Sequence, residues 1–207
     1  NGDADAFVEA VKKVTGKGKT LVLSCKNPEA VKKALDVCKD EKPILNGADA
    51  SNYAEMVEIA KAAGVVLGVS GADINELYDT TAAIEKLGYK ELVLDTTGAT
   101  IKETFATTVQ VRRACLAKEP DRTFGYPSIV NLSKVAPDDE AMQIALASVF
   151  VLKYGSIIVM DTMNYARGLA LYGLRQNVYT DPQKPMKVEP GIYPLNGADE
   201  NSVVLTT

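Results

Sequence analysis

Residues 64–95 read GVVLGVSGADINELYDTTAAIEKLGYKELVLD, and this stretch contains one full strand–helix–strand unit. Its two ends, Val65–Ser70 and Glu91–Asp95, are short apolar runs without polar alternation, as is typical of strands covered on both faces. Between them, apolar residues recur at helical spacing, at Ile74, Leu77, Ile84 and Leu87. The stretch therefore predicts two parallel strands joined by an amphipathic helix.

Boundary residues support this unit and its neighbours. Gly64 and Gly88 each stand between a helical stripe and a strand, where a left-handed residue commonly ends a helix. Asp73 and Ser51 are predicted to cap the amino ends of their helices. Asn27-Pro28-Glu29 combines an N-cap, a proline suited to the first helical position and an acid in the first turn.

The same unit repeats along the chain. The expected strands are Thr20–Cys25, Pro43–Asn46, Val65–Ser70, Glu91–Asp95, Phe124–Asn131 and Ser156–Asp161. The expected helical stripes run from Val8 to Val14, Val31 to Cys38, Met56 to Ala60, Ile74 to Leu87, Phe105 to Leu116, Met142 to Leu152 and Leu169 to Leu174. Repeated units of this kind predict a parallel sheet with right-handed crossovers.

Two α/β architectures fit this order, an open doubly wound sheet and a (β/α)₈ TIM-like barrel. The chain contains neither Gly-x-Gly-x-x-Gly nor the phosphate-loop motif Gly-x-x-x-x-Gly-Lys-Ser/Thr, which mark many open sheets that bind nucleotides. The even spacing of the units favours the barrel, assigned to residues 1–178. The first helix has no strand before it, so we expect the first strand of the barrel to lie before Asn1.

Composition excludes several classes of function. The 207 residues include no histidine, which removes Ser-His-Asp and Cys-His systems and His-ligated zinc. A net charge of −4 is unlike the basic face of a nucleic-acid-binding protein. No apolar run approaches the roughly 18 residues of a membrane span. The three widely spaced cysteines, Cys25, Cys38 and Cys115, predict free thiols in a cytoplasmic protein.

Polar side chains gather where the predicted strands end, which is the active face of a parallel barrel. The candidate pocket residues are Asn46, Ser70, Asp95, Asn131, Asp161 and Asn164. Such amides, hydroxyls and carboxylates are suited to a heterocycle such as a pterin, and Asp95 and Asp161 would form an acid/base pair if both face the mouth. The same residue types are also common as turn and capping residues. An aldolase-like barrel would need a Schiff-base lysine, for which Lys26 is the candidate.

The amino-acid composition and periodicity of the chain change after the last helical stripe. Residues 179–195 are rich in proline and lack helical period, which is typical of an extended connector. Residues 196–207 end in the apolar run Val203-Val-Leu, which we interpret as the beginning of a further domain.

This part of the chain carries a distinctive signature. It contains Arg-Gln-Asn-Val-Tyr-Thr-Asp-Pro at 175–182 and Glu-Pro-Gly-Ile-Tyr at 189–193, in that order. The signature residues are Arg175, Asn177, Tyr179, Asp181, Glu189 and Tyr193. With Asp199–Ser202, they resemble the large (gamma) subunit of the corrinoid iron–sulfur protein found in acetyl-CoA synthase/decarbonylase complexes.

The resemblance implies a subunit with an N-terminal [4Fe-4S] domain, a central (β/α)₈ barrel and a C-terminal corrinoid domain that would begin at residues 196–207. Such a subunit pairs with a small subunit. It receives a methyl group from a methyltetrahydropterin through a methyltransferase, and passes it to acetyl-CoA synthase. For the present chain we expect a barrel that acts as scaffold and docking surface, with no catalytic residue, metal ligand or cofactor of its own. A pterin-binding methyltransferase barrel is the alternative.

Overall fold

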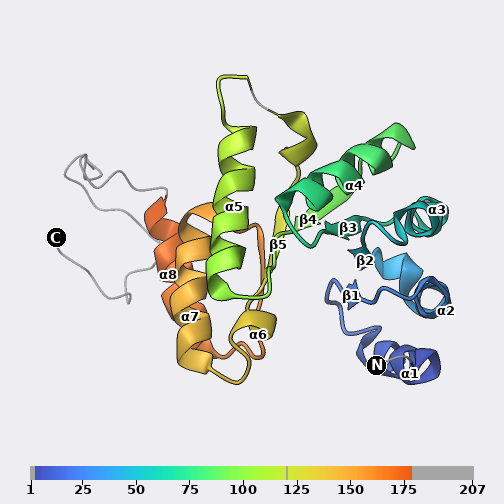
Figure 1. Cartoon of the computed structure of the whole chain (residues 1–207). Coiled ribbons are helices and arrows are strands. Elements are labelled where there is room, and N and C mark those ends of the chain that lie inside the picture. Colours follow the sequence, from blue (N-terminus) through green and yellow to red (C-terminus); the bar gives the residue numbers. More distant parts are fainter. Residues whose placement is uncertain (1–2, 120, 179–207) are drawn as a thin grey trace, which may run out of the picture.

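The computed structural model describes residues 3–119 and 121–178 (Figure 1). Its helices are α1 (Ala4–Val14), α2 (Pro28–Cys38), α3 (Tyr53–Ala63), α4 (Ile74–Lys86), α5 (Ile101–Cys115), α6 (Leu132–Val135), α7 (Glu140–Val149) and α8 (Tyr165–Val178). Its strands are β1 (Val22–Ser24), β2 (Ile44–Ala48), β3 (Leu67–Ser70), β4 (Leu92–Asp95), β5 (Ser128–Asn131) and β6 (Ile157–Val159). Short 3₁₀ helices cover Lys39–Glu41 and Arg122–Phe124, and a π-helical turn, η3, covers Phe150–Tyr154. Within the described ranges, no helix has the length and apolar character needed to cross a bilayer.

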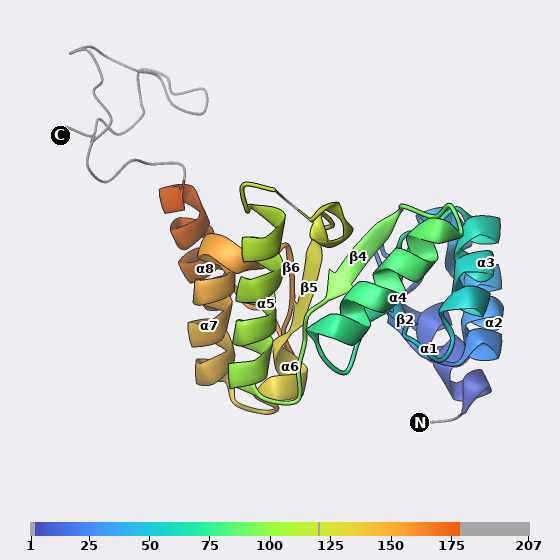
Figure 2. The same cartoon turned by 45° about the horizontal axis from the view of Figure 1, so that its top comes forward.

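The strands form one parallel sheet in which their order in space is their order in the chain, β1 to β6. An open doubly wound sheet reverses its strand order at a switch point, so this order excludes that alternative. The sheet curls into a half-barrel with the helices along its outer side (Figures 1 and 2). The α/β class and the barrel-like curvature are thus confirmed.

Most of the predicted helix boundaries are confirmed. The Asn27 side chain accepts hydrogen bonds from the backbone N–H groups of Glu29 and Ala30 at the start of α2. Asp73 makes the equivalent bonds at the start of α4. Gly64 and Gly88 adopt φ values of +63° and +78°, the left-handed conformation in which glycine carries no steric penalty.

The prediction for Ser51 is wrong. Helix α3 begins after Asn52, and no side chain caps its first turn. The Ser51 hydroxyl and backbone N–H both donate instead to the carboxylate of Asp49, at 2.6 and 2.9 Å. Because the helix starts one residue later than predicted, Asn52 occupies the N-cap position and Ser51 lies just before it.

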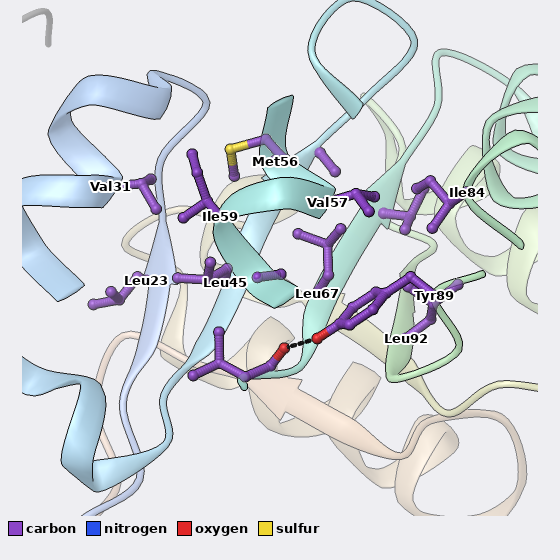
Figure 3. Close-up of a cluster of buried hydrophobic side chains, with 14 of the residues drawn as sticks. Leu23, Val31, Leu45, Met56, Val57, Ile59, Leu67, Ile84, Tyr89 and Leu92 are labelled. Atoms are coloured by element: carbon purple, nitrogen blue, oxygen red, sulfur yellow. Dashed lines mark hydrogen bonds between the residues drawn. The ribbon is translucent and has the colours of Figure 1, made fainter. Parts of the chain in front are cut away.

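The main core lies between the outer face of the sheet and helices α2, α3 and α4. Leu23, Leu45, Leu67 and Leu92 are paired in register across β1 to β4, and all four are buried. Figure 3 shows this row packed against side chains of the covering helices, namely Val31, Met56, Val57, Ile59 and Ile84. The row of leucines therefore fixes which face of each strand meets the helices.

A second cluster of buried residues covers β5 and β6. It contains Val130, Leu132, Ala147, Phe150 and Leu171, contributed by β5, α6, α7, η3 and α8. Helix α5 borders this cluster through Phe105, whose ring contacts those of Phe150 and Tyr154 at centroid distances of 6.3 and 5.7 Å.

Helix α5 differs from its predicted stripe. Phe105 is partly exposed and Leu116 is 65% exposed, while Thr104, Thr108 and Val111 are buried. The buried hydroxyls are satisfied, because Thr108 donates to the Thr104 carbonyl at 2.7 Å and lies 2.8 Å from the Thr96 hydroxyl. Threonine side chains of α5 therefore face the protein interior at positions that apolar periodicity did not predict to be buried.

The fifth strand is also shorter than predicted. Phe124 belongs to a 3₁₀ turn, and the strand begins only at Ser128. The turn is held by Asp121, whose side chain accepts a hydrogen bond from the Thr123 N–H. Pro127, which lacks an N–H, immediately precedes the strand.

Leu45→Ala should lower the free energy of unfolding by about 2–5 kcal/mol, because Leu45 is fully buried and the substitution leaves a cavity. Leu116→Ala is the matched control and should change it by less than about 0.5 kcal/mol, since Leu116 is mostly exposed. Urea denaturation measures both variants. Equal losses in the two would contradict the assigned core.

Candidate functional site

The inner face of the half-barrel carries a polar group at the carboxyl ends of the strands. In β2 the outward Leu45 is buried, whereas Ile44 and Asn46, on the opposite face, are half-buried. Asn46 Nδ2 donates a hydrogen bond of 2.7 Å to Oδ2 of Asp95, at the end of β4. This bond joins two strands that are not neighbours, because β3 lies between them.

Gly68 of β3 allows this bond. It is paired in register with Asn46, and a Cβ placed on it would lie 2.3 Å from Asn46 Oδ1. Any other residue at this position would push the amide away from Asp95. A glycine inside a strand is a known signal of close approach, so the sequence contained this clue although the residue was not predicted for the site.

Further hydrogen bonds continue from Asp95 to the next loops. The Thr97 N–H donates to Asp95 Oδ1 at 3.0 Å, and the Thr97 hydroxyl accepts from the Asn131 N–H at 2.8 Å. The Asn131 side chain caps α6 by accepting from the Lys134 N–H. Ser70 is the register partner of Asp95, and its hydroxyl donates to the Ala48 carbonyl at 3.3 Å. Asn46, Ser70 and Asp95 are thus brought together, and Asn131 is linked to them through Thr97.

Asp161 is engaged elsewhere. Its Oδ2 accepts a hydrogen bond of 2.5 Å from Nε2 of Gln143, a fully buried residue of α7, and its N–H donates to Gln143 Oε1. Hydrogen bonds from Gln143 and then Ser133 hold the pKa of Asp161 below its ordinary value. The structure therefore joins Asp161 to α7 and does not bring it into contact with Asp95. Sequence reasoning missed Gln143, because a glutamine within an apolar helix gives no separate signal.

Asn164 and Arg167 organise the start of α8. The Asn164 side chain accepts a hydrogen bond from the Arg167 N–H at 3.0 Å, as a capping residue does. Arg167 is only 3% exposed, and its guanidinium binds the Thr162 carbonyl and hydroxyl and the carboxylate of Glu140. Arg167 thus ties α8 to the first turn of α7. No sequence pattern pointed to it.

The signature residues lie at or past the end of the described chain. Arg175 is an exposed residue of α8, and Asn177 belongs to the last turn of that helix. Tyr179, Asp181, Glu189 and Tyr193, together with the predicted connector 179–195 and the segment 196–207, lie outside the described residues.

The loops after β1 and β2 are joined by an ion pair in which Asp49 is largely shielded and Lys26 is mostly exposed. Lys26 Nζ lies 2.6 Å from Asp49 Oδ2, and Asn52 Nδ2 donates to the carbonyls of Lys26 and Gly47. Burial works to raise the pKa of Asp49, but hydrogen bonds from Lys26 and Ser51 outweigh it and hold the pKa below its ordinary value. Lys26 is thus occupied as a structural cation, which disfavours the Schiff-base hypothesis.

A cavity of about 300 Å³ adjoins Asp95, between the first turns of α4 and α5. Its lining includes Asp95, Thr96 and Thr97, together with Asp73 at the N-cap of α4 and Glu103 in the first turn of α5. Both of these acids also cap helices, since Asp73 accepts from α4 and Glu103 completes a capping box with Thr100. The volume is at the lower end of the range for small-molecule pockets.

Taken together, the fold and the site define a partial parallel α/β barrel with a hydrogen-bonded amide–carboxylate pair at its strand ends. The chain belongs to the family described as CO dehydrogenase/acetyl-CoA synthase delta subunit, whose model matches residues 1–207.

Curated relatives cover essentially the whole chain. The corrinoid/iron–sulfur protein large subunit of Moorella thermoacetica is 37% identical over 206 residues, covering 99% of this chain and 45% of that protein. The acetyl-CoA decarbonylase/synthase complex subunit gamma of Methanothermobacter thermautotrophicus is 32% identical over 218 residues, covering 100% and 47%. The corresponding subunit of Archaeoglobus fulgidus is 29% identical over 217 residues, covering 100% and 46%. The resemblance to large (gamma) subunits is confirmed, and the chain spans a little under half the length of these relatives.

The residues present do not fit the cofactors named in the first relative. An iron–sulfur cluster of the [4Fe-4S] type takes four cysteine thiolates, and this chain has three, in β1–α2, α2 and α5. Within residues 3–119 and 121–178, no group of three or more His, Cys, Asp or Glu side chains is placed to hold a metal ion. Three cavities among the residues that the structure describes measure about 300 to 400 Å³, and each is too small to enclose a corrinoid macrocycle.

Gly68→Ala should break the Asn46–Asp95 bond and lower the free energy of unfolding by about 1–3 kcal/mol, because the added methyl group overlaps the Asn46 amide. Gly173→Ala is the control, since a Cβ there has nothing within 4 Å, and it should be neutral or stabilising. Urea denaturation gives the energies, and the side-chain amide signal of Asn46 in an NMR spectrum reports the bond. An unchanged amide signal in Gly68→Ala would contradict the geometry.

Asp49→Asn should reduce the loss of stability in acid. A carboxyl with a lowered pKa in the folded state stabilises the fold above its unfolded pKa of about 3.9, and this contribution is lost as the pH falls through the lower folded value. The free energy of unfolding should therefore fall less between pH 6 and pH 3 in Asp49→Asn than in the parent. Asp36→Asn, on the exposed face of α2, should keep the parental profile.

Proposed function

We propose that this chain is the (β/α)₈ barrel portion of a corrinoid iron–sulfur methyl-carrier subunit in the reductive acetyl-CoA pathway. In this proposal the whole subunit accepts a methyl group from a methyltetrahydropterin and passes it to acetyl-CoA synthase. The observation that carries the proposal is the match of the entire chain to large and gamma subunits of such complexes. In this proposal the barrel works as scaffold and docking surface.

The hydrogen bonding at the strand ends supports a scaffold role. Asn131 and Asn164 cap helices, and Asp161 is bound by Gln143. Lys26 and Asp49 hold two loops together. Catalytic side chains must be able to contact a substrate, whereas these side chains are already hydrogen-bonded to the loops around the sheet.

Helix α8 offers a surface for the small subunit of the complex. Tyr165, Leu169 and Tyr172 follow one another at helical spacing on the side of α8 opposite the buried Arg167 and Leu171, and Met163 precedes them. These four side chains are 61 to 85% exposed. Tyrosine and methionine are enriched in protein interfaces, and membership in a complex calls for such a surface.

Leu169→Glu should weaken co-purification of the chain with the small subunit by about tenfold or more, because it places a charge at the centre of an apolar contact. Leu116→Glu is the matched control, with nearly the same exposure but at the end of α5, and it should leave binding unchanged. Size-exclusion chromatography and titration of the two subunits provide the measurement. Equal binding by both variants would place the partner elsewhere.

The methyl-carrier assignment is tested on the whole protein that contains this chain, purified without oxygen. Elemental analysis should find both cobalt and iron, and isotope-labelled methyltetrahydrofolate should transfer its methyl group to the protein in the presence of its methyltransferase. A protein that contains neither metal would overturn the assignment.

A pterin-binding methyltransferase barrel is the second candidate, and the Asn46–Asp95 pair favours it. Asn46 donates to Asp95 through Nδ2, and within the described residues its Oδ1 has no hydrogen-bond donor. Asp95, the acceptor of this bond, also lines a cavity of about 300 Å³, so its carboxylate oxygens are acceptors at the cavity wall. A pterin ring carries adjacent N–H donors that match such acceptors.

Calorimetric titration with methyltetrahydrofolate separates the two candidates. If the barrel binds the pterin, Asp95→Asn should abolish the heat of binding, while Asp161→Asn should retain it because Asp161 is bound to Gln143 instead. Absence of binding by the parent chain would exclude the second candidate and leave the methyl-carrier proposal intact.

A further inference from the structure

The opposite end of the sheet holds a cavity of a different character. It measures about 400 Å³ and lies at the amino ends of β5 and β6. Its walls come from the last two turns of α5, from residues 124–128 and from residues 153–156. The cavity shares no lining residue with the one beside Asp95.

Cations line this cavity, and carboxylates do not. Arg112 projects from α5, and Lys153 comes from η3. The other two cavities contain acids, with Asp36 and Glu55 in one and Asp73 and Asp95 in the other. In a chain with a net charge of −4, the charged side chains that line this cavity are thus both cations, and the Glu85 carboxylate outside the lining is bound by the Tyr126 hydroxyl.

The two cations lack ionised partners within the part of the chain that the structure describes. Arg112 makes no ion pair or hydrogen bond there with its guanidinium, and Lys153 Nζ lies 5.5 Å from the centroid of the Tyr154 ring. A cation over an aromatic face remains available to an anion. A basic residue near the end of a helix also favours the helix dipole, but Arg113 shares that position without lining the cavity.

Hydroxyl groups and an aromatic wall complete the cavity. The Ser128 N–H donates to Ser156 Oγ at 3.2 Å, so the Ser156 hydroxyl accepts from the protein and retains its hydrogen for a ligand. Ser128 Oγ donates to the Tyr154 carbonyl. Tyr126 is not available as a donor, because its hydroxyl binds Glu85 Oε1 at 2.6 Å. The rings of Tyr126 and Tyr154 provide flat apolar surface beside these polar groups.

We propose that this cavity binds a small phosphate monoester, with the phosphate between Arg112 and Lys153 and the organic part against Tyr154. A dianion matches two cations from separate elements, and a guanidinium binds phosphate oxygens in a bidentate manner. The volume exceeds the needs of inorganic phosphate and fits a small organic ester. The proposal is independent of the methyl-carrier function, because it concerns the opposite end of the sheet.

Phenyl phosphate is the probe, titrated into the full chain at low ionic strength and followed by calorimetry. Arg112→Gln and Lys153→Gln should each weaken binding by about tenfold or more, because each removes a charge-assisted contact. Arg113→Gln is the matched control, with the same charge change on the same helix turn, and it should bind as the parent does. Inorganic phosphate should bind more weakly than phenyl phosphate.

Three results would overturn the proposal. They are the absence of saturable binding by the parent chain, an equal loss of affinity in Arg113→Gln and Arg112→Gln, and equal affinity for phenyl phosphate and inorganic phosphate. Circular dichroism of each variant establishes that it remains folded.

Discussion

The parallel hydrogen-bonded ladder from β1 to β6 is the constraint on which the rest of the structure depends. Each strand pairs with the next one in the chain, so every crossover must return along the same side of the sheet. The helices therefore collect on the outer face, where the row from Leu23 to Leu92 meets them. The inner face is left to the alternate residues, and these carry the polar groups.

The arrangement of the inner face depends on Gly68, a residue without a side chain. Without a Cβ at Gly68, the Asn46 amide lies over the middle strand and reaches Asp95 two strands away. Thr97 and Asn131 extend the connection to the next loop. The strand ends are consequently held to one another by hydrogen bonds, and Asp95 is the member of the Asn46–Asp95 pair that lines the cavity.

The two ends of the sheet differ in charge. Acids and amides gather at the carboxyl end, whereas Arg112 and Lys153 line the cavity at the amino end. The exposed stripe on α8 adds a third surface, suited to a protein partner. These features agree with the scaffold role proposed above.

Sequence alone determined the class of fold, because apolar runs, helix N-caps and the glycines that end helices act through neighbours in the chain. Their effect does not depend on how the elements pack. Asn27, Asp73, Gly64 and Gly88 perform the predicted roles for that reason. The same applies to family membership, since the signature after residue 174 is a property of the chain itself. The sequence pattern also placed Asn46, Ser70 and Asp95 near the ends of predicted strands, and a parallel sheet brings such ends to one edge.

Only the tertiary structure decided which polar groups meet. Asp161 is bound by Gln143, and Thr108 of α5 faces Thr96, in each case because a partner from another element satisfied the hydrogen bond. Arg167 is buried where Glu140, at the start of α7, and Thr162, in the loop before α8, bind its guanidinium. Hydrogen bonds are short-ranged and directional, so their partners are set by the packing of elements in space, and spacing along the chain does not reveal them.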